Sequence, residues 1–199
     1  MDFLAQLNYV EVFGFVTGVT CVWLYTRQNV WSWPIGLVNA VVFVIVFFQA
    51  RLYADTGLYV IYALLSIYGW YEWLRGGPKH SKLKISRLTR TTALVLMGLA
   101  VVGVGGLSYG LRTYTDAALP FWDSLTTAMS LAAQWMLAKK IFETWIVWIT
   151  VDVIYLGVYF YRDLYLTAGL HLIYLALAIV GLLAWRSSMR AESATVSAY

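Results

Sequence analysis

Asp152 lies at the centre of an apolar segment that runs from about residue 143 to residue 161. Trp145, Trp148 and Tyr155 surround it at intervals of three or four residues, so the four side chains share one face of a helix. A charged side chain in hydrocarbon costs about 2.5–3.5 kcal/mol, so Asp152 should face a ligand, water or a partner group. The pattern leaves two alternatives open, which are contact with a substrate and a structural hydrogen bond to a neighbouring helix.

Further polar and aromatic residues occur inside the other apolar segments. Asn39 follows Trp33 by six residues, Tyr59 and Tyr62 are one turn apart, and Gln134 supplies another amide. Aromatic faces stack on flat rings and attract cations, whereas amides and tyrosine hydroxyls can bind hydroxyl groups. We therefore expect a site for a planar cationic heterocycle with a polar tail. The expected substrate-binding residues are Trp33, Asn39, Tyr59, Tyr62, Gln134, Trp145, Trp148, Asp152 and Tyr155.

Other kinds of chemistry lack the residues that they need. Cys21 is the single cysteine, which excludes a disulfide or a cysteine metal site within one chain. The sequence shows no zinc, phosphate-loop or nucleophile–base pattern, so we expect no catalytic residue, no metal and no cofactor. His171 can be interpreted either as a proton-coupling group or as a structural residue. A membrane enzyme acting on a lipid or isoprenoid is the alternative from a different functional class, and it would need clustered acids, histidines or a metal set.

The composition places these residues in a membrane. The 199-residue chain is 61% hydrophobic and 12% charged, whereas an ordinary soluble domain has about 25% charged residues. This excludes a soluble enzyme and a nucleic-acid-binding domain. A helix needs roughly 20 apolar residues to cross a bilayer. The sequence predicts an all-α integral membrane protein with seven such spans, near residues 8–26, 33–50, 56–74, 92–111, 121–138, 143–161 and 166–185.

The distribution of basic residues predicts the orientation. Lys and Arg in short loops stay on the cytoplasmic side. With seven spans, Arg51, Arg112 and Arg162 fall on one side and the other eleven Lys and Arg fall on the opposite side. We therefore expect the N-terminus outside and the C-terminus in the cytoplasm. The basic run at 75–90 has an alternative interpretation as a patch for lipid headgroups or nucleotides. Tryptophans near span ends often lie at the membrane interface, and we expect this of Trp31, Trp73 and Trp185.

The chain contains an internal repeat with a constant spacing, so that position 52 in the first copy corresponds to position 164 in the second. We call this spacing the repeat offset. Residues 52–73 align without a gap on residues 164–185, with ten of 22 positions identical. The same offset pairs Trp33 with Trp145 and Glu11 with Asp123. The sequence thus predicts two three-helix copies joined by a linker helix, a parallel 3+1+3 repeat of the kind that SWEET transporters use. The predicted parts are residues 1–74, a basic loop and linker helix at 75–120, and residues 121–199. The alternative is a duplicated structural protein without transport.

Several motifs together resemble the PnuC family of bacterial vitamin transporters. These are VWSWPIGLVNA, FFQARLYAD, IYGWYEW, AAQWMLAKK, ETWIVWITVDVIYLGVY and LYLTAGL, and the resemblance covers essentially residues 11–186. It implies a 3+1+3 fold related to SWEETs in the bacterial inner membrane. It also implies uptake of nicotinamide riboside by facilitated diffusion, trapping of the product by a cytoplasmic vitamin kinase, and a homotrimeric assembly.

Two positions depart from the family pattern. Tyr59 stands where many members have Gln, and Thr144 stands where many have Asn. The loss of two amides changes which polar groups of a ligand can be satisfied. Thiamine, which is also cationic and aromatic, and riboflavin, which is neutral and larger, therefore remain alternatives to nicotinamide riboside.

Overall fold

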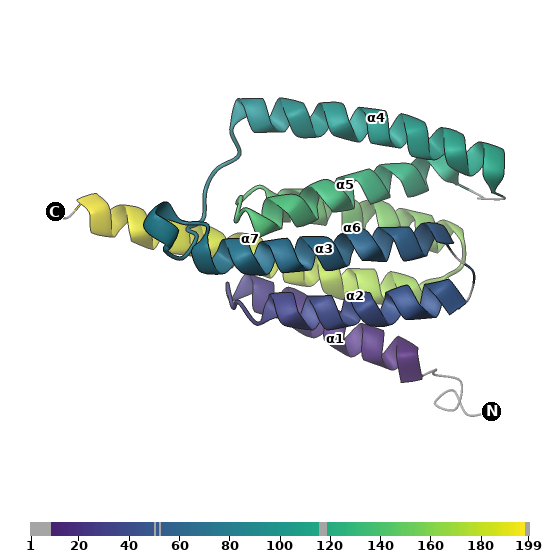
Figure 1. Ribbon diagram of the computed structural model, residues 1–199, viewed down its shortest axis with the longest axis horizontal. Helices are drawn as coiled ribbons and strands as arrows, with labels where there is room; N and C mark the ends of the chain where they lie inside the picture. The colour runs from purple at the N-terminus through teal and green to yellow at the C-terminus, as the bar shows by residue number, and fades with distance from the viewer. Residues whose placement is uncertain (1–8, 50, 52, 116–118, 198–199) are drawn as a thin grey trace. The chain divides into compact units, whose positions relative to one another are not determined.

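The computed structural model describes residues 9–49, 51, 53–115 and 119–197, and these residues form an almost entirely helical protein (Figure 1). Within them lie seven long helices, which confirms the all-α prediction. The helices are α1 (Tyr9–Thr26), α2 (Ser32–Gln49), α3 (Tyr53–Arg75), α4 (Arg90–Tyr114), α5 (Pro120–Ala138), α6 (Thr144–Tyr161) and α7 (Tyr165–Ser197), with a short 3₁₀ helix at Pro78–His80.

The chain forms two compact units, residues 1–83 and residues 84–199. In the first unit α1 packs on α2 and α2 packs on α3. In the second unit α4 packs on α5, α5 on α6 and α6 on α7. The helix that follows the basic loop is therefore part of the second unit.

Four helices are long and apolar enough to cross a membrane, namely α2, α4, α6 and the Tyr165–Glu192 part of α7. Their outward faces are apolar: on α4, for example, Val101 is 73% exposed and Val102 is 74% exposed. Apolar side chains exposed in this way are suited to contact lipid tails, because soluble proteins rarely expose large apolar patches to water. The apolar part of α1 is shorter, at Val12–Thr26. For α1, α3 and α5, which are less uniformly apolar, membrane crossing stays a prediction.

The turns that follow equivalent helices have the same unusual backbone. After α1, Gln28 has a φ of 53°, and after α5, Lys140 has a φ of 49°. After α2, Arg51 has a φ of 59°, and after α6, Asp163 has a φ of 57°. Non-glycine residues adopt this left-handed region rarely, and the repeat offset relates the two members of each pair. It also carries both ends of α2 onto those of α6, and the start of α3 onto the start of α7.

The segment before α4 is fastened to the turn between α5 and α6. Ser86 forms a parallel β-bridge with Ile141. The carboxylate of Glu143 accepts hydrogen bonds from the backbone N–H of Leu88, at 2.8 Å, and from the guanidinium of Arg87, at 3.2 Å. These contacts fix the entry of α4 relative to the other helices of its own unit.

The last helix extends well past the predicted span at 166–185, because α7 continues to Ser197. The extension contains Ala, Met, Arg and Glu, which are good helix formers. Lys84, at the start of the second unit, forms an ion pair with Glu192 on this extension.

Candidate substrate-binding site

Asp152 on α6 is bonded to His171 on α7. The Oδ1 atom of Asp152 lies 2.9 Å from Nδ1 of His171, and the two side chains are only 5% and 15% exposed. Sequence reasoning identified both residues but did not pair them. A signal was available: Asp152 lies ten residues before Arg162 and His171 nine residues after it, and Arg162 is in the turn between the two helices. In an antiparallel helical hairpin, equal distances from the turn correspond to equal depths.

Three tyrosines surround the imidazole of His171. The rings of Tyr155 and Tyr159 stack with centroids 5.5 Å apart, and they lie 4.5 and 5.2 Å from the His171 ring. The ring of Tyr174 meets His171 edge-on at 5.8 Å. We call Asp152, His171, Tyr155, Tyr159 and Tyr174 the polar cluster. It brings together two of the predicted site residues, Asp152 and Tyr155, with three that the prediction did not include.

The hydroxyl of Tyr155 connects this cluster to α5. Its hydrogen-bond partners there are the side chains of Thr126 and Ser130. Both are almost completely buried, at 1% and 3% exposure. These two hydroxyl-bearing side chains of α5 are therefore directed inward, toward α6.

The first unit contains an aromatic cluster of the same form, made of Phe43, Phe47, Tyr59 and Tyr62. Phe43 and Phe47 stack at 5.7 Å, and they lie 5.1 and 5.2 Å from the ring of Tyr59. Tyr62 meets Tyr59 edge-on at 5.7 Å. The predicted site residues Tyr59 and Tyr62 thus belong to this aromatic cluster, and Tyr59 packs mainly among other rings.

Trp33, at the start of α2, is completely buried, and its ring meets that of Trp73 edge-on at 5.4 Å. Gly69 on α3 lies under the indole, in a place where a Cβ atom would collide with the ring. Trp73 is 3% exposed, so its expected place at the membrane interface is wrong. The expectation failed because the ring of Trp33, which Gly69 admits to the contact between α2 and α3, covers Trp73.

The second unit repeats this arrangement with Trp145, Trp185 and Gly181. The two rings meet edge-on at 5.5 Å, and a Cβ at Gly181 would come within 2.6 Å of the Trp145 ring. Trp185 is completely buried, so the interfacial prediction is wrong for this residue too, whereas Trp31 is 64% exposed.

The indole nitrogens of Trp33 and Trp145 are buried and, within the described part of the chain, have no hydrogen-bond partner. Buried donors of this kind are rare in folded proteins. Asn39 is different, because its amide nitrogen donates to Oγ1 of Thr17 at 2.6 Å and so joins α2 to α1. Gln134 and Trp148 are half-buried.

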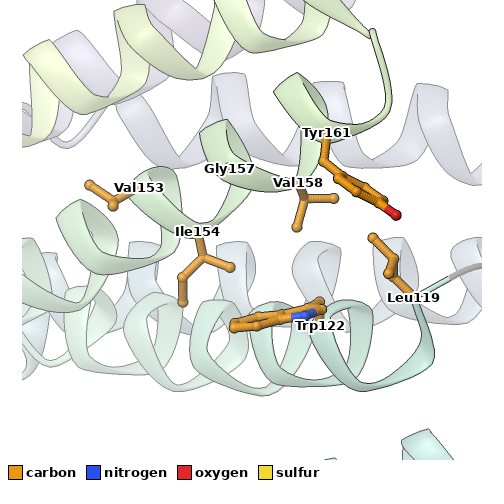
Figure 2. A pocket seen from close by; sticks show the side chains of 7 residues that line it. All are labelled: Leu119, Trp122, Val153, Ile154, Gly157, Val158 and Tyr161. Atoms are coloured by element: carbon orange, nitrogen blue, oxygen red, sulfur yellow. The ribbon is translucent and has the colours of Figure 1, made fainter.

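An apolar groove of about 390 Å³ lies elsewhere in the second unit, between α6 and the start of α5. Figure 2 shows its lining residues Leu119, Trp122, Val153, Ile154, Gly157, Val158 and Tyr161. None of the predicted site residues lines this groove. Its lining offers few of the convergent polar groups that fix the orientation of a small ligand, so the polar cluster is the better candidate site.

Comparisons with known proteins agree on one family. The family described as nicotinamide mononucleotide transporters matches residues 8–187. The nicotinamide riboside transporter PnuC of Escherichia coli is 28% identical, over 93% of this chain and 88% of that protein. The riboflavin/roseoflavin transporter RibM of Streptomyces davaonensis is 24% identical, over 96% of this chain and 91% of that protein.

A solved structure adds the fold. A crystal structure of the vitamin B3 transporter PnuC matches this structure with a TM-score of 0.71 at 21% identity, and the match covers 93% of this chain and 83% of that one. The chain therefore shares the fold of a transporter over nearly its whole length.

Proposed function

We propose that this chain, which belongs to the nicotinamide mononucleotide transporter family, takes up nicotinamide riboside. Its motifs and its relatives of the PnuC type agree with this family. Membership of this family makes the chain a membrane transporter and not an enzyme, which removes the lipid-modifying alternative. The observation that supports the substrate best is the alignment of 93% of the chain with the nicotinamide riboside transporter of E. coli.

Riboflavin is the second candidate substrate, because a relative named for riboflavin transport aligns over 96% of this chain. Neither relative described above is named for thiamine transport. Binding to the purified protein distinguishes the three vitamins, since tryptophans and tyrosines are abundant and their fluorescence should be quenched by a stacked ring. We expect nicotinamide riboside to raise the melting temperature and to quench fluorescence. A response to riboflavin or thiamine alone would reject nicotinamide riboside as the substrate.

We propose that transport proceeds by alternating access between two related three-helix bundles. The support is the repeat offset, which relates the Trp33–Gly69 and Trp145–Gly181 contacts as well as the left-handed turn residues Gln28 and Lys140. In this proposal α1–α3 and α5–α7 are the two copies of a parallel 3+1+3 repeat, and α4 is the linker.

We propose facilitated diffusion, with trapping of the vitamin by a cytoplasmic kinase and with a homotrimeric assembly in the bacterial inner membrane. In support, Asp152 is bonded to His171 and not to a second carboxylate, so among the described residues it belongs to no acidic pair that could hold Na⁺. Asp152 and His171 can each bind a proton, so the proton-gradient arm of the following experiment is the decisive one. Uptake into vesicles should therefore persist without an ion gradient and stop at equilibrium. Accumulation of unmodified vitamin driven by an imposed proton or sodium gradient would contradict this mechanism.

A further inference from the structure

The polar cluster and the aromatic cluster occupy equivalent positions in the two units. The repeat offset carries Phe43, Phe47, Tyr59 and Tyr62 onto Tyr155, Tyr159, His171 and Tyr174 in that order. The ring contacts correspond one by one, including the stacked pair at 5.7 Å in the first unit and 5.5 Å in the second. The same packing framework is therefore built twice, once from two phenylalanines and two tyrosines and once from three tyrosines and a histidine.

The Asp152–His171 pair is not needed to build this framework. The first unit has Ala40 at the position of Asp152 and Tyr59 at the position of His171. Ala40 is 2% exposed, so the same place in the helix contact is filled there without a charge. A buried pair of ionisable groups is often no more stabilising than well-packed apolar groups, because both groups must be removed from water. Stability alone therefore does not explain why Asp152 and His171 are present.

A second difference between the clusters also indicates that the polar groups have a role beyond packing. In the first unit Gly14 lies directly against the ring of Phe43, with no room for a side chain. In the second unit Thr126 stands at the position of Gly14, and its side chain bonds to the hydroxyl of Tyr155. The second unit keeps the ring contacts and adds hydroxyl, carboxylate and imidazole groups that can form hydrogen bonds.

We infer that Asp152 and His171, together with the Tyr155 hydroxyl, form the subsite that binds the polyol part of the vitamin, and that His171 is a specificity-determining residue. This inference rests on the proposed function. A carboxylate accepts hydrogen bonds, an imidazole nitrogen donates or accepts, and a phenol does both, so the group complements neighbouring hydroxyls. Nicotinamide riboside and riboflavin both carry such hydroxyls, on a ribosyl and a ribityl group respectively.

The bond to His171 also changes the expected role of Asp152. A carboxylate without a partner would attract the positively charged ring, as the sequence suggested. A carboxylate that shares one oxygen with His171 has that attraction reduced, because a protonated imidazole compensates its charge and a neutral one occupies an acceptor site. The subsite therefore selects hydroxyl groups more strongly than it selects a positive charge.

Ligands that keep the ring but lack the polyol distinguish recognition of the hydroxyl groups from recognition of the ring. N-methylnicotinamide keeps the cationic ring of nicotinamide riboside but lacks the sugar, and lumichrome keeps a ring system related to that of riboflavin but lacks the ribityl chain. Dissociation constants would be measured by tryptophan fluorescence on the purified full-length protein. We expect the unmodified protein to bind nicotinamide riboside at least about tenfold more tightly than N-methylnicotinamide, or riboflavin at least about tenfold more tightly than lumichrome.

The informative variant is the double change Asp152→Ala with His171→Tyr, because the first unit packs those residues at the equivalent positions. It should keep the melting temperature within a few degrees and reduce the tenfold ligand preference to about threefold or less. His171→Gln, which keeps one hydrogen-bonding group, should give an intermediate preference. Ile154→Ala, on the same helix but in the apolar groove, is the control and should leave the preference unchanged.

The outcomes are distinct. A double variant that folds and keeps the full preference for the polyol ligand would overturn the inference while leaving the proposed transport function intact. Equal losses for the ligands with and without the polyol would assign the pair a purely structural role and overturn it as well. If the unmodified protein binds neither nicotinamide riboside nor riboflavin, the proposed function fails, and the subsite that rests on it fails too.

Discussion

The indole ring of Trp145 on α6 lies against Gly181 on α7, with no space between them for a side chain. A Cβ atom at Gly181 would come within 2.6 Å of the ring. Trp145 is 1% exposed and also meets Trp185 edge-on, so its ring is held between Gly181 and a second indole. A single glycine thus determines how closely α6 approaches α7, and the polar cluster lies along the same pair of helices.

This contact predicts that Gly181→Ala destabilises the protein. Forcing an extra methyl group into a packed contact costs about 1–3 kcal/mol, which should lower the melting temperature measurably in detergent. Gly169→Ala on the same helix is the control, because no atom lies within 4 Å of its Cβ position. Alanine favours a helix by up to about 1 kcal/mol over glycine, so the control should be neutral or slightly more stable. A Gly181→Ala protein as stable as the control would show that the ring contact is not tight.

The Asp152–His171 pair predicts a non-additive effect on stability. Removing one partner alone, as in Asp152→Ala or His171→Tyr, breaks the bond between them, and leaving a buried polar group unsatisfied costs about 1–3 kcal/mol. Removing both together, as Asp152→Ala with His171→Tyr, should restore much of that loss. The measurement is a comparison of melting temperatures for the unmodified protein, the two single variants and the double variant. Additive losses would indicate that the two side chains do not depend on each other.

The contacts that hold the segment before α4 in place predict that Glu143 contributes more to the stability of this segment than an ordinary surface charge does. Its carboxylate accepts from the backbone of Leu88 at 2.8 Å and is 22% exposed. Hydrogen bonds to charged groups contribute about 1.5–3 kcal/mol, whereas exposed ion pairs contribute at most about 1 kcal/mol. Glu143→Gln should therefore speed proteolysis in the 84–89 segment.

The control for Glu143 is Glu192→Gln, which removes the more exposed ion pair with Lys84. It should change proteolysis little. If both variants were cleaved at the rate of the unmodified protein, the Glu143 contacts would not hold this segment in place.

The basic residues predict a topology that can be measured directly. A reporter fused after Tyr199 or inserted near residue 82 should be cytoplasmic, and one at the N-terminus should be outside. The physical reason is that Lys and Arg in short loops are retained on the cytoplasmic side. Reporters that place both termini on one side of the membrane would rule out seven spans.

The sequence by itself determined the helical class, the positions of the helices and the family. Long apolar runs can satisfy their backbone in a membrane only as helices, so the starts and ends of α2 and α6 could be predicted closely. The family was evident because its motifs combine tryptophan, glycine and acidic residues that apolar helices do not share by chance. The repeat offset was also visible, since it is a property of residue order alone.

Only the tertiary structure decided which side chains meet. The pairing of Asp152 with His171 depends on how α6 and α7 are rotated about their axes, and hydrophobic segments do not encode that rotation clearly. The burial of Trp73 and Trp185 was mispredicted for the same reason, because each is covered by a tryptophan that a glycine admits to the helix contact. The contrast between the apolar and the polar cluster became visible once the equivalent rings could be compared in space.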